Sequence, residues 1–283
     1  MAVHIITDSA SDIVGNTDPR LSVVPLSVTF GDTVYRDGVD LTQQQFYKML
    51  VSREDLPTTS QVTPYAFALE IDRVLDSGEE GDEVVVLTLS SKLSGTYQSA
   101  VEAAEGNNKV QVIDTLNVSL GERAIVEYAM RLVDEGYNAS QIAARIMAVR
   151  DRVRVLALLD TLEYLKRGGR VSKFVGTMGE LLSYKPIVGV VDGEVVMVDK
   201  ARGTKKGRIL MRKLIEREGL DTSMPVRMGY AGFDDYSLRM FLQANHDAWE
   251  NSVAEEDLPI DCVGATIGTH VGPGAIGIAF FTK

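Results

Sequence analysis

The first half of the chain alternates short apolar runs with segments whose apolar residues recur every three or four positions. The apolar runs predict strands at residues 3–7, 23–30, 83–89 and 109–115. The segments with helical spacing lie between and after these runs, at residues 42–51, 63–78, 95–106, 119–136 and 138–153. Apolar strands that alternate with helices are typical of a parallel sheet covered by helices on both faces. We therefore expect a three-layer α/β/α domain with a parallel sheet.

The second half has a different pattern, which predicts a mixed sheet. Residues 185–202 contain two apolar runs on either side of Asp192-Gly193, and Asp-Gly between such runs is a strong hairpin signal. Further strands are expected at residues 153–161 and 226–232 and in the C-terminal segment 262–283, with helices at residues 162–169, 174–184, 205–219 and 234–249. A hairpin with interspersed helices predicts a two-layer α/β domain with helices on one side. We place the boundary near Asp151, which gives domains at residues 1–152 and 153–283.

Composition and length narrow the class of protein. The 283 residues are 45% hydrophobic and 24% charged, which is ordinary for a globular protein. Cys262 is the single cysteine, so no internal disulfide can form and a reducing compartment is expected. The N-terminus lacks the basic and apolar regions of a signal peptide, and no apolar run approaches the roughly 18 residues that span a bilayer. These features predict a soluble, cytoplasmic protein.

Charge is distributed unevenly between the two halves. The formal net charge of −11 argues against nucleic acid as the main partner. Residues 1–152 carry 12 Lys and Arg against 23 Asp and Glu, whereas residues 153–283 carry 17 of each. Basic residues gather at 166–173 and at 200–213, and the second stretch contains no acid. Such clusters fit either a solvated helix face or a surface that meets an anion or an acidic partner.

Hydroxyl side chains are concentrated in four segments of the first half, at residues 7–11, 58–61, 90–96 and 114–119. In a parallel sheet, ligands bind beyond the carboxyl ends of the strands, where loops lead into helices. Each hydroxyl taken alone is explained by helix capping. Four such loops at one end of a sheet predict a pocket for a carboxylate or phosphate, held by hydroxyls and helix N-termini without a metal.

His270 is the histidine best placed to contribute chemistry. It lies in the segment "THVGPGAIG", and we expect it in a glycine-rich loop, where the backbone can approach a ligand closely. His4 falls inside a predicted strand, and His246 falls on a predicted helix surface.

Seven segments together resemble the DegV family of bacterial fatty-acid-binding proteins. They are, in order, "TDSASD", "LPTTSQ", "LSSKLSGTYQSA", "YLKRGGRVS", "KPI…DG", "KARGTKK" and "IGTHVGPGAIG", and they extend from Ile5 to Phe280. The order and spacing of the set are specific, although no single segment is. The family's proline after Thr-Ser-Gln is replaced here by Val62, with Pro64 two residues later.

The resemblance implies a site and a reaction. A long-chain fatty acid would lie between two domains, with its carboxylate held by Thr59, beside Ser60, and by Ser94, beside Gly95. His270, Arg170 and Arg202 would support phosphoryl transfer. A separate kinase subunit would transfer phosphate from ATP to the carboxylate, and the acyl phosphate would feed phospholipid synthesis. This chain would be a lipid-binding subunit rather than an enzyme, with at most transient membrane contact.

The residues themselves agree with a ligand site that needs no cofactor. The chain has no GxxxxGK[ST] P-loop and no GxGxxG after a strand, so no nucleotide site is predicted. Cys and His are too few for a zinc site. Bidentate Arg side chains suit a phosphate better than Lys does. The segment 174–182 either lines the acyl tunnel or packs as an ordinary amphipathic helix.

Two other functions remain open from the sequence. Ser94 and His270, with an aspartate such as Asp8, are the residue types of a serine hydrolase or acyltransferase. The serine lies in "LSG", however, rather than in the GxSxG elbow. A regulator that binds a sugar or a phosphate would use the same polar pocket without an acyl tail.

Overall fold

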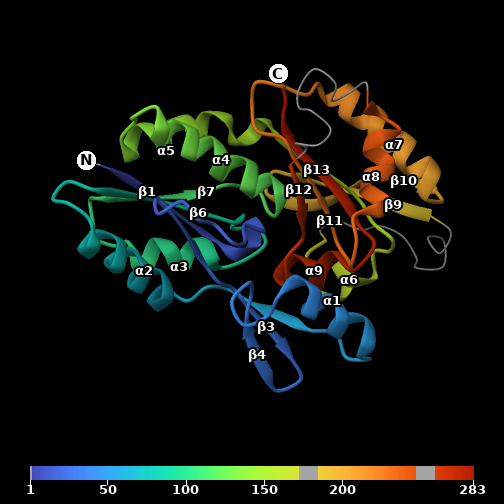
Figure 1. The fold of residues 1–283 in the computed structure, drawn as a ribbon, viewed down its shortest axis with the longest axis horizontal. Helices are drawn as coiled ribbons and strands as arrows, with labels where there is room; N and C mark the ends of the chain where they lie inside the picture. Colours follow the sequence, from blue (N-terminus) through green and yellow to red (C-terminus); the bar gives the residue numbers. More distant parts are fainter. Residues whose placement is uncertain (1, 172–183, 247–258) are drawn as a thin grey trace.

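The computed structural model of the protein describes residues 2–171, 184–246 and 259–283, which form three β-sheets with their surrounding helices (Figure 1). The helix predicted at residues 174–184 lies almost entirely outside these ranges, so that prediction and its place along an acyl tunnel are untested. No helix in the described ranges is long and apolar enough to cross a membrane.

The parallel sheet of the first half confirms the α/β prediction. Its order is β2 (Leu21–Val24), β1 (Val3–Asp8), β6 (Glu83–Thr88) and β7 (Val110–Asp114), and all neighbours are parallel. The helices that cover this sheet are α2 (Pro64–Ser77), α3 (Thr96–Ala103), α4 (Leu120–Asp134) and α5 (Ala139–Val149). One face of the sheet packs against α2 and α3 and the other against α4 and α5 (Figure 1). Because both faces are covered, the central strand β6 is a continuous apolar run.

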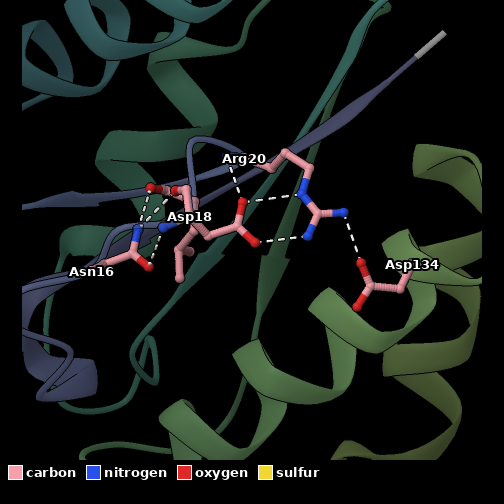
Figure 2. Close-up of polar contacts among 5 residues, drawn as sticks. Asn16, Asp18, Arg20 and Asp134 are labelled. Atoms are coloured by element: carbon pink, nitrogen blue, oxygen red, sulfur yellow. Dashed lines mark hydrogen bonds and ion pairs between the residues drawn. The ribbon is translucent and has the colours of Figure 1, made fainter.

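Hydrogen bonds and ion pairs connect the loop between β1 and β2 to the end of α4 (Figure 2). The Asp18 carboxylate accepts from the guanidinium of Arg20, which also pairs with Asp134 at the end of α4 at 2.7 Å. The Asn16 amide donates to the carbonyl oxygens of Asp18 and Leu21. These groups are partly exposed, so the pairs mainly fix the path of the loop between β1 and β2 and add little stability.

A small antiparallel sheet corrects two sequence predictions. Its order is β4 (Thr33–Arg36), β3 (Ser27–Phe30) and β5 (Thr58–Ser60), and it packs with α1 (Gln43–Ser52). Residues 23–30 were predicted as one strand, but the chain leaves the parallel sheet at Pro25, which cannot donate a ladder hydrogen bond. Residues 58–61 were predicted as a loop, but three of them form β5. This strand pairs with β3 through Val28 opposite Thr59.

The mixed sheet of the second half confirms the predicted hairpin. Its order is β10 (Glu194–Arg202), β9 (Tyr184–Val191), β8 (Val153–Leu158), β13 (Ile276–Phe281), β11 (Arg227–Tyr230) and β12 (Ile260–Cys262). Only β11 and β12 pair in parallel among these strands of the described ranges. Helices α7 (Thr204–Glu218) and α8 (Tyr236–Gln243) cover one face with an apolar core. The opposite face lies toward the first half of the chain (Figure 1).

Two short helices in the second half stand beside this opposite face, α6 (Glu163–Arg167) and α9 (Ala265–Val271). Two 3₁₀ turns complete the described elements, η1 (Ser9–Ser11) and η2 (Arg150–Arg152). His270 is in the last turn of α9, so its predicted position in a glycine-rich loop is wrong. The glycine-rich turn begins two residues later, at Gly272.

The two halves of the chain contact each other through buried polar groups. At the hairpin turn, the Ser90 hydroxyl donates to the Gly193 carbonyl at 2.7 Å. At the opposite edge of the mixed sheet, Arg123 of α4 pairs with Asp261 of β12 at 3.1 Å. Each of these contacts joins the first half of the chain to the second, so a movement of one half relative to the other would break them. The division at residue 152 stays a prediction.

Candidate functional site

A cavity of about 560 Å³ lies between the β5 segment, the loop that leads into α3, and the α6 and α9 helices. Side chains of both halves of the chain line it: Leu26, Thr59, Ser60, Gln61, Leu89, Leu93, Ser94, Val118, Leu165, Arg170, Val195, Thr266, Ile267, His270 and Val271. The polar members of this set are gathered from segments that are far apart in the sequence. We call this space the polar cavity.

Ser94 is held at the start of α3. Its hydroxyl shares a hydrogen bond of 2.8 Å with the Thr96 hydroxyl and accepts from the Thr96 backbone N–H at 3.2 Å. Gly95 allows the Gln61 side chain to cross above it, because a methyl group built on Gly95 would overlap that amide. The first backbone N–H groups of a helix have no partner inside the helix, so they are available to an anion. Hydroxyls and N–H groups are thus directed to one end of the cavity.

Thr59 and His270 form the second polar pair. The Thr59 hydroxyl lies 2.9 Å from His270 Nε2, although the two residues are 211 positions apart. Burial, and to a lesser degree the charge of Arg170, lower the pKa of His270 to about 4. The imidazole is therefore neutral at physiological pH and carries one ring N–H.

The position of His270 is fixed from both ends of α9. The carboxylate of the buried Asp37 accepts from the backbone N–H groups of Ala265 and Thr266 at 3.0 and 2.9 Å. Beneath the ring, a methyl group built on Gly168 would overlap His270 Nδ1. The Nδ1 atom is buried and has no hydrogen-bond partner among the described residues. The ring therefore presents Nε2 to Thr59 and turns its other nitrogen toward a glycine backbone.

Arg170 supplies positive charge to the polar cavity. Its guanidinium donates to the Gly168 carbonyl at 2.6 Å and approaches the Leu93 carbonyl at 3.5 Å. No carboxylate in the described part of the chain forms an ion pair with it, so its charge is available to an anionic ligand.

An apolar cavity of about 600 Å³ lies beside the polar one. Five residues line both: Val118, Leu165, Val195, Ile267 and Val271. The rest of its lining comes mainly from the face of the mixed sheet opposite α7 and α8, including Ala157, Val188 and Gly277. A charged or hydroxylated head and a long apolar tail would therefore find matching surroundings in two adjoining cavities.

The structure brings together most of the residues selected from the sequence, but not all. Thr59, Ser60, Ser94, Arg170 and His270 line one cavity, and Gly95 shapes its wall. Arg202 is not among the lining residues; it ends β10 and lies over the Tyr184 ring at 5.5 Å.

Two of the four hydroxyl segments have an internal role instead. At residues 7–11 and 114–119, the hydroxyls of Thr7, Ser11, Thr115 and Ser119 donate to groups of the protein itself. These four hydroxyls therefore serve contacts within the protein, and Ser119 precedes α4 without a side-chain cap hydrogen bond.

The arrangement of a serine-hydrolase triad is not present at Ser94. His270 Nε2 is bonded to Thr59, whereas the Ser94 hydroxyl is bonded to Thr96. The Asp8 carboxylate is buried and accepts from the N–H groups of Ala10 and Leu89. In the described parts of the chain, no group of three His, Cys, Asp or Glu side chains is arranged to hold a metal ion.

Sequence reasoning missed Asp37 and Val195. Asp37 stands 228 residues before the helix that it caps, so no local pattern indicates its role. Val195 belongs to the run Val195-Val196-Met197-Val198 of β10, which predicts a strand but does not show which of its residues face a cavity.

The neutral state of His270 predicts a pH dependence of stability. Between pH 6.5 and about 4 the unfolded chain binds a proton at this histidine and the folded chain does not, so stability is lost as pH falls. The loss is about 3 kcal/mol at 1.36 kcal/mol per pH unit. Burial raises the pKa of Asp8 and Asp12 to about 7, and their titration acts in the opposite sense. The contribution of His270 is therefore measured as the difference in unfolding free energy between wild type and His270→Gln, from urea unfolding at several pH values across this range. A difference that does not change with pH would contradict the prediction.

Comparisons with known proteins identify the family. The family model described as "Uncharacterised protein, DegV family" matches residues 2–283. A DegV domain-containing protein of Caldanaerobacter subterraneus is 34% identical, with 99% of each chain covered. A structure of a fatty-acid-binding DegV family protein from Thermus thermophilus is 32% identical, with a TM-score of 0.84 over 100% of both chains. A DegV lipid-binding protein from Thermotoga maritima is 28% identical, with a TM-score of 0.83 over 99% of this chain and 98% of that one. A family model that matches nearly the whole chain and relatives that align end to end show that this protein belongs to the DegV family.

Proposed function

We propose that this protein binds a long-chain fatty acid, with the carboxylate in the polar cavity and the acyl chain in the apolar one. The observation that carries the proposal is that a cavity with polar groups adjoins an apolar one, with five lining residues in common. Burying an acyl chain is favourable by about 0.8 kcal/mol per methylene, so the tail supplies most of the affinity. The fatty-acid-binding relative from Thermus thermophilus supports the same ligand class.

The head group is held by hydroxyls in this proposal. Neutral His270 donates from Nε2 to the Thr59 hydroxyl oxygen, and Thr59 then directs its own hydrogen at the carboxylate. This tautomer leaves the lone pair of Nδ1 against Gly168, where no donor is present among the described residues. Ser94, beside Ser60 and Gly95, provides the second donor together with the N-terminus of α3.

We further propose that the protein presents the bound carboxylate to a separate kinase subunit. A carboxylate oxygen attacks the γ-phosphorus of ATP, the bond to the β-phosphate oxygen breaks, and acyl phosphate and ADP are formed. The charge that develops on the transferred group is met by Arg170, which has no carboxylate partner in the described ranges. Arg202 lies outside the polar cavity, so its support of this step stays a prediction.

The setting of this reaction is part of the proposal. ATP as phosphate donor places the protein in the cytoplasm, with transient membrane contact to exchange its lipid. An acyl phosphate is an activated acyl donor, which suits the supply of acyl chains for phospholipid synthesis. This chain needs no cofactor for its own part, because hydroxyls and N–H groups suffice for the carboxylate and one guanidinium meets the charge of the transferred phosphoryl group.

Mass spectrometry of ligand extracted from the purified protein tests the proposal. A long-chain fatty acid is expected in near-equal molar amount with the protein, since burial of its acyl chain makes binding tight. Protein stripped of lipid should then bind added fatty acid in a calorimetric titration. Recovery of a phosphosugar, or no lipid together with no binding, would reject a fatty-acid carrier.

A further inference from the structure

A row of residues that runs across the mixed sheet supplies part of the lining of the apolar cavity. From β10 to β11 the directly paired residues are Met197, Val188, Ala157, Gly277 and Gly229, and all of them except Met197 line the cavity. Paired residues point to the same face of a sheet, so these side chains decrease in size along the row from methionine to glycine. The row therefore forms a groove that deepens toward β13 and β11.

The deep end of this groove is filled by Leu120, the first residue of α4. A methyl group built on Gly229 would lie 2.9 Å from Leu120 Cδ2, and one built on Gly277 would lie 3.2 Å from Leu120 Cδ1. Leu120 is buried, and it lines the apolar cavity together with both glycines. The leucine occupies the space that side chains at the two glycines would otherwise take.

The backbone before Leu120 is held firmly by the first half of the chain. The Ser119 N–H donates to the Ala10 carbonyl at 2.8 Å, and its hydroxyl donates to the Asp12 carboxylate at 2.5 Å. Ser119 has a φ of 57°, a conformation that non-glycine residues rarely adopt without such support. The position of Leu120 is thus set by one half of the chain and the glycine floor by the other.

Beyond the two glycines the row ceases to be apolar. The partner of Gly229 on β12 is Asp261, which is ion-paired with Arg123 at 3.1 Å and with Arg227 at 3.5 Å. An acyl chain cannot extend into this buried ion-pair network without desolvating it. Removing Leu120 would therefore add a limited length, about two strand spacings of about 4.8 Å.

We propose that Leu120, seated on the Gly229–Gly277 pair, is the stop that limits the length of the acyl chain. The inference rests on the proposed fatty-acid binding and goes beyond it, because it assigns the length selection to one side chain. Acids that reach Leu120 are bound with their full tail buried. Longer acids must leave methylenes outside the groove or displace the leucine.

Binding of a homologous series of saturated acids to Leu120→Ala tests the proposal. Myristate, palmitate, stearate, arachidate and behenate are titrated into lipid-free wild type and variant. The variant is expected to prefer a longer acid than wild type does, with a gain of about fourfold for each additional buried methylene. The double variant Leu120→Ala/Gly277→Ala puts a methyl group back on the groove floor, and we expect the preferred length to move back toward that of wild type.

Leu214→Ala is the matched control, because this buried leucine belongs to α7 and packs against the opposite face of the same sheet. It should bind the series with the length preference of wild type. An unchanged preference in folded Leu120→Ala, or an equal change in Leu214→Ala, would overturn the assignment. If Leu120→Ala does not fold, Leu120→Val gives the same comparison with a smaller shift. Absence of binding to wild type itself would instead refute the proposed function.

Discussion

Replacing Arg170 by alanine is expected to reduce acyl-phosphate formation by a partner kinase on the order of 100-fold, while fatty-acid affinity changes only a few-fold. The estimate follows the loss of one preorganised donor at a site where charge develops. Arg170 lines the polar cavity without a carboxylate partner in the described ranges, whereas Thr59 and Ser94 are the donors proposed for the carboxylate. The measurement pairs a calorimetric titration of the acid with a radiolabelled-ATP assay of acyl phosphate.

Arg167→Ala is the matched control for this prediction. Arg167 is on α6, three residues from Arg170, but it pairs with Glu163 and does not line the cavity. Fatty-acid affinity and the rate of acyl-phosphate formation should both be close to the wild-type values in this variant. A loss of fatty-acid binding in Arg170→Ala as large as its loss of phosphorylation would assign Arg170 to the carboxylate site and contradict the division between binding and transfer.

Local sequence patterns were sufficient for elements whose own apolar residues show how they are buried. The continuous apolar run of β6 and the helical spacing of α4 reflect burial on both faces and on one face, respectively, and both predictions are confirmed. The hairpin of β9 and β10 turns at Asp192 and Gly193, both with positive φ, which is what the Asp-Gly pair indicates.

The elements that were mispredicted depend on contacts between distant residues. Strand β5 has three residues, too few for a periodic pattern, and it exists through pairing with β3. Helix α9 contains Gly268, a poor helix former. That glycine is needed because Phe46 and Tyr47 approach its backbone, and Asp37 caps the helix from far away in the sequence.

The candidate site shows the same division. Family resemblance selected Thr59, Ser94, Arg170 and His270, and the structure places all four along one cavity. The apolar cavity was not predictable, because its floor depends on the register of four strands that come from different parts of the sequence. Glycines at residues 229 and 277 look like ordinary weak points of a strand until the register places them side by side under Leu120.

Replacing Thr59 by valine is expected to weaken fatty-acid binding by about 1–3 kcal/mol, or roughly 5- to 150-fold. Valine has nearly the shape of threonine and suits a strand, so β5 should form as before. In the proposed site this change removes the hydroxyl that accepts from His270 and donates to the carboxylate. The imidazole N–H and the carboxylate would then both be buried without that hydrogen-bond partner.

The neighbouring variant Thr58→Val separates this effect from a change in the strand. Thr58 is exposed and its side chain points to the other face of β5, so fatty-acid affinity should stay at the wild-type value. The matching fatty alcohol provides a second comparison, because it carries no charge to be left unpaired. We expect Thr59→Val to weaken the alcohol much less than the acid in calorimetric titrations. Equal losses for acid and alcohol would show that Thr59 contributes packing rather than a hydrogen bond to the carboxylate. In that case the head group must be held mainly by Ser94 and the N-terminus of α3.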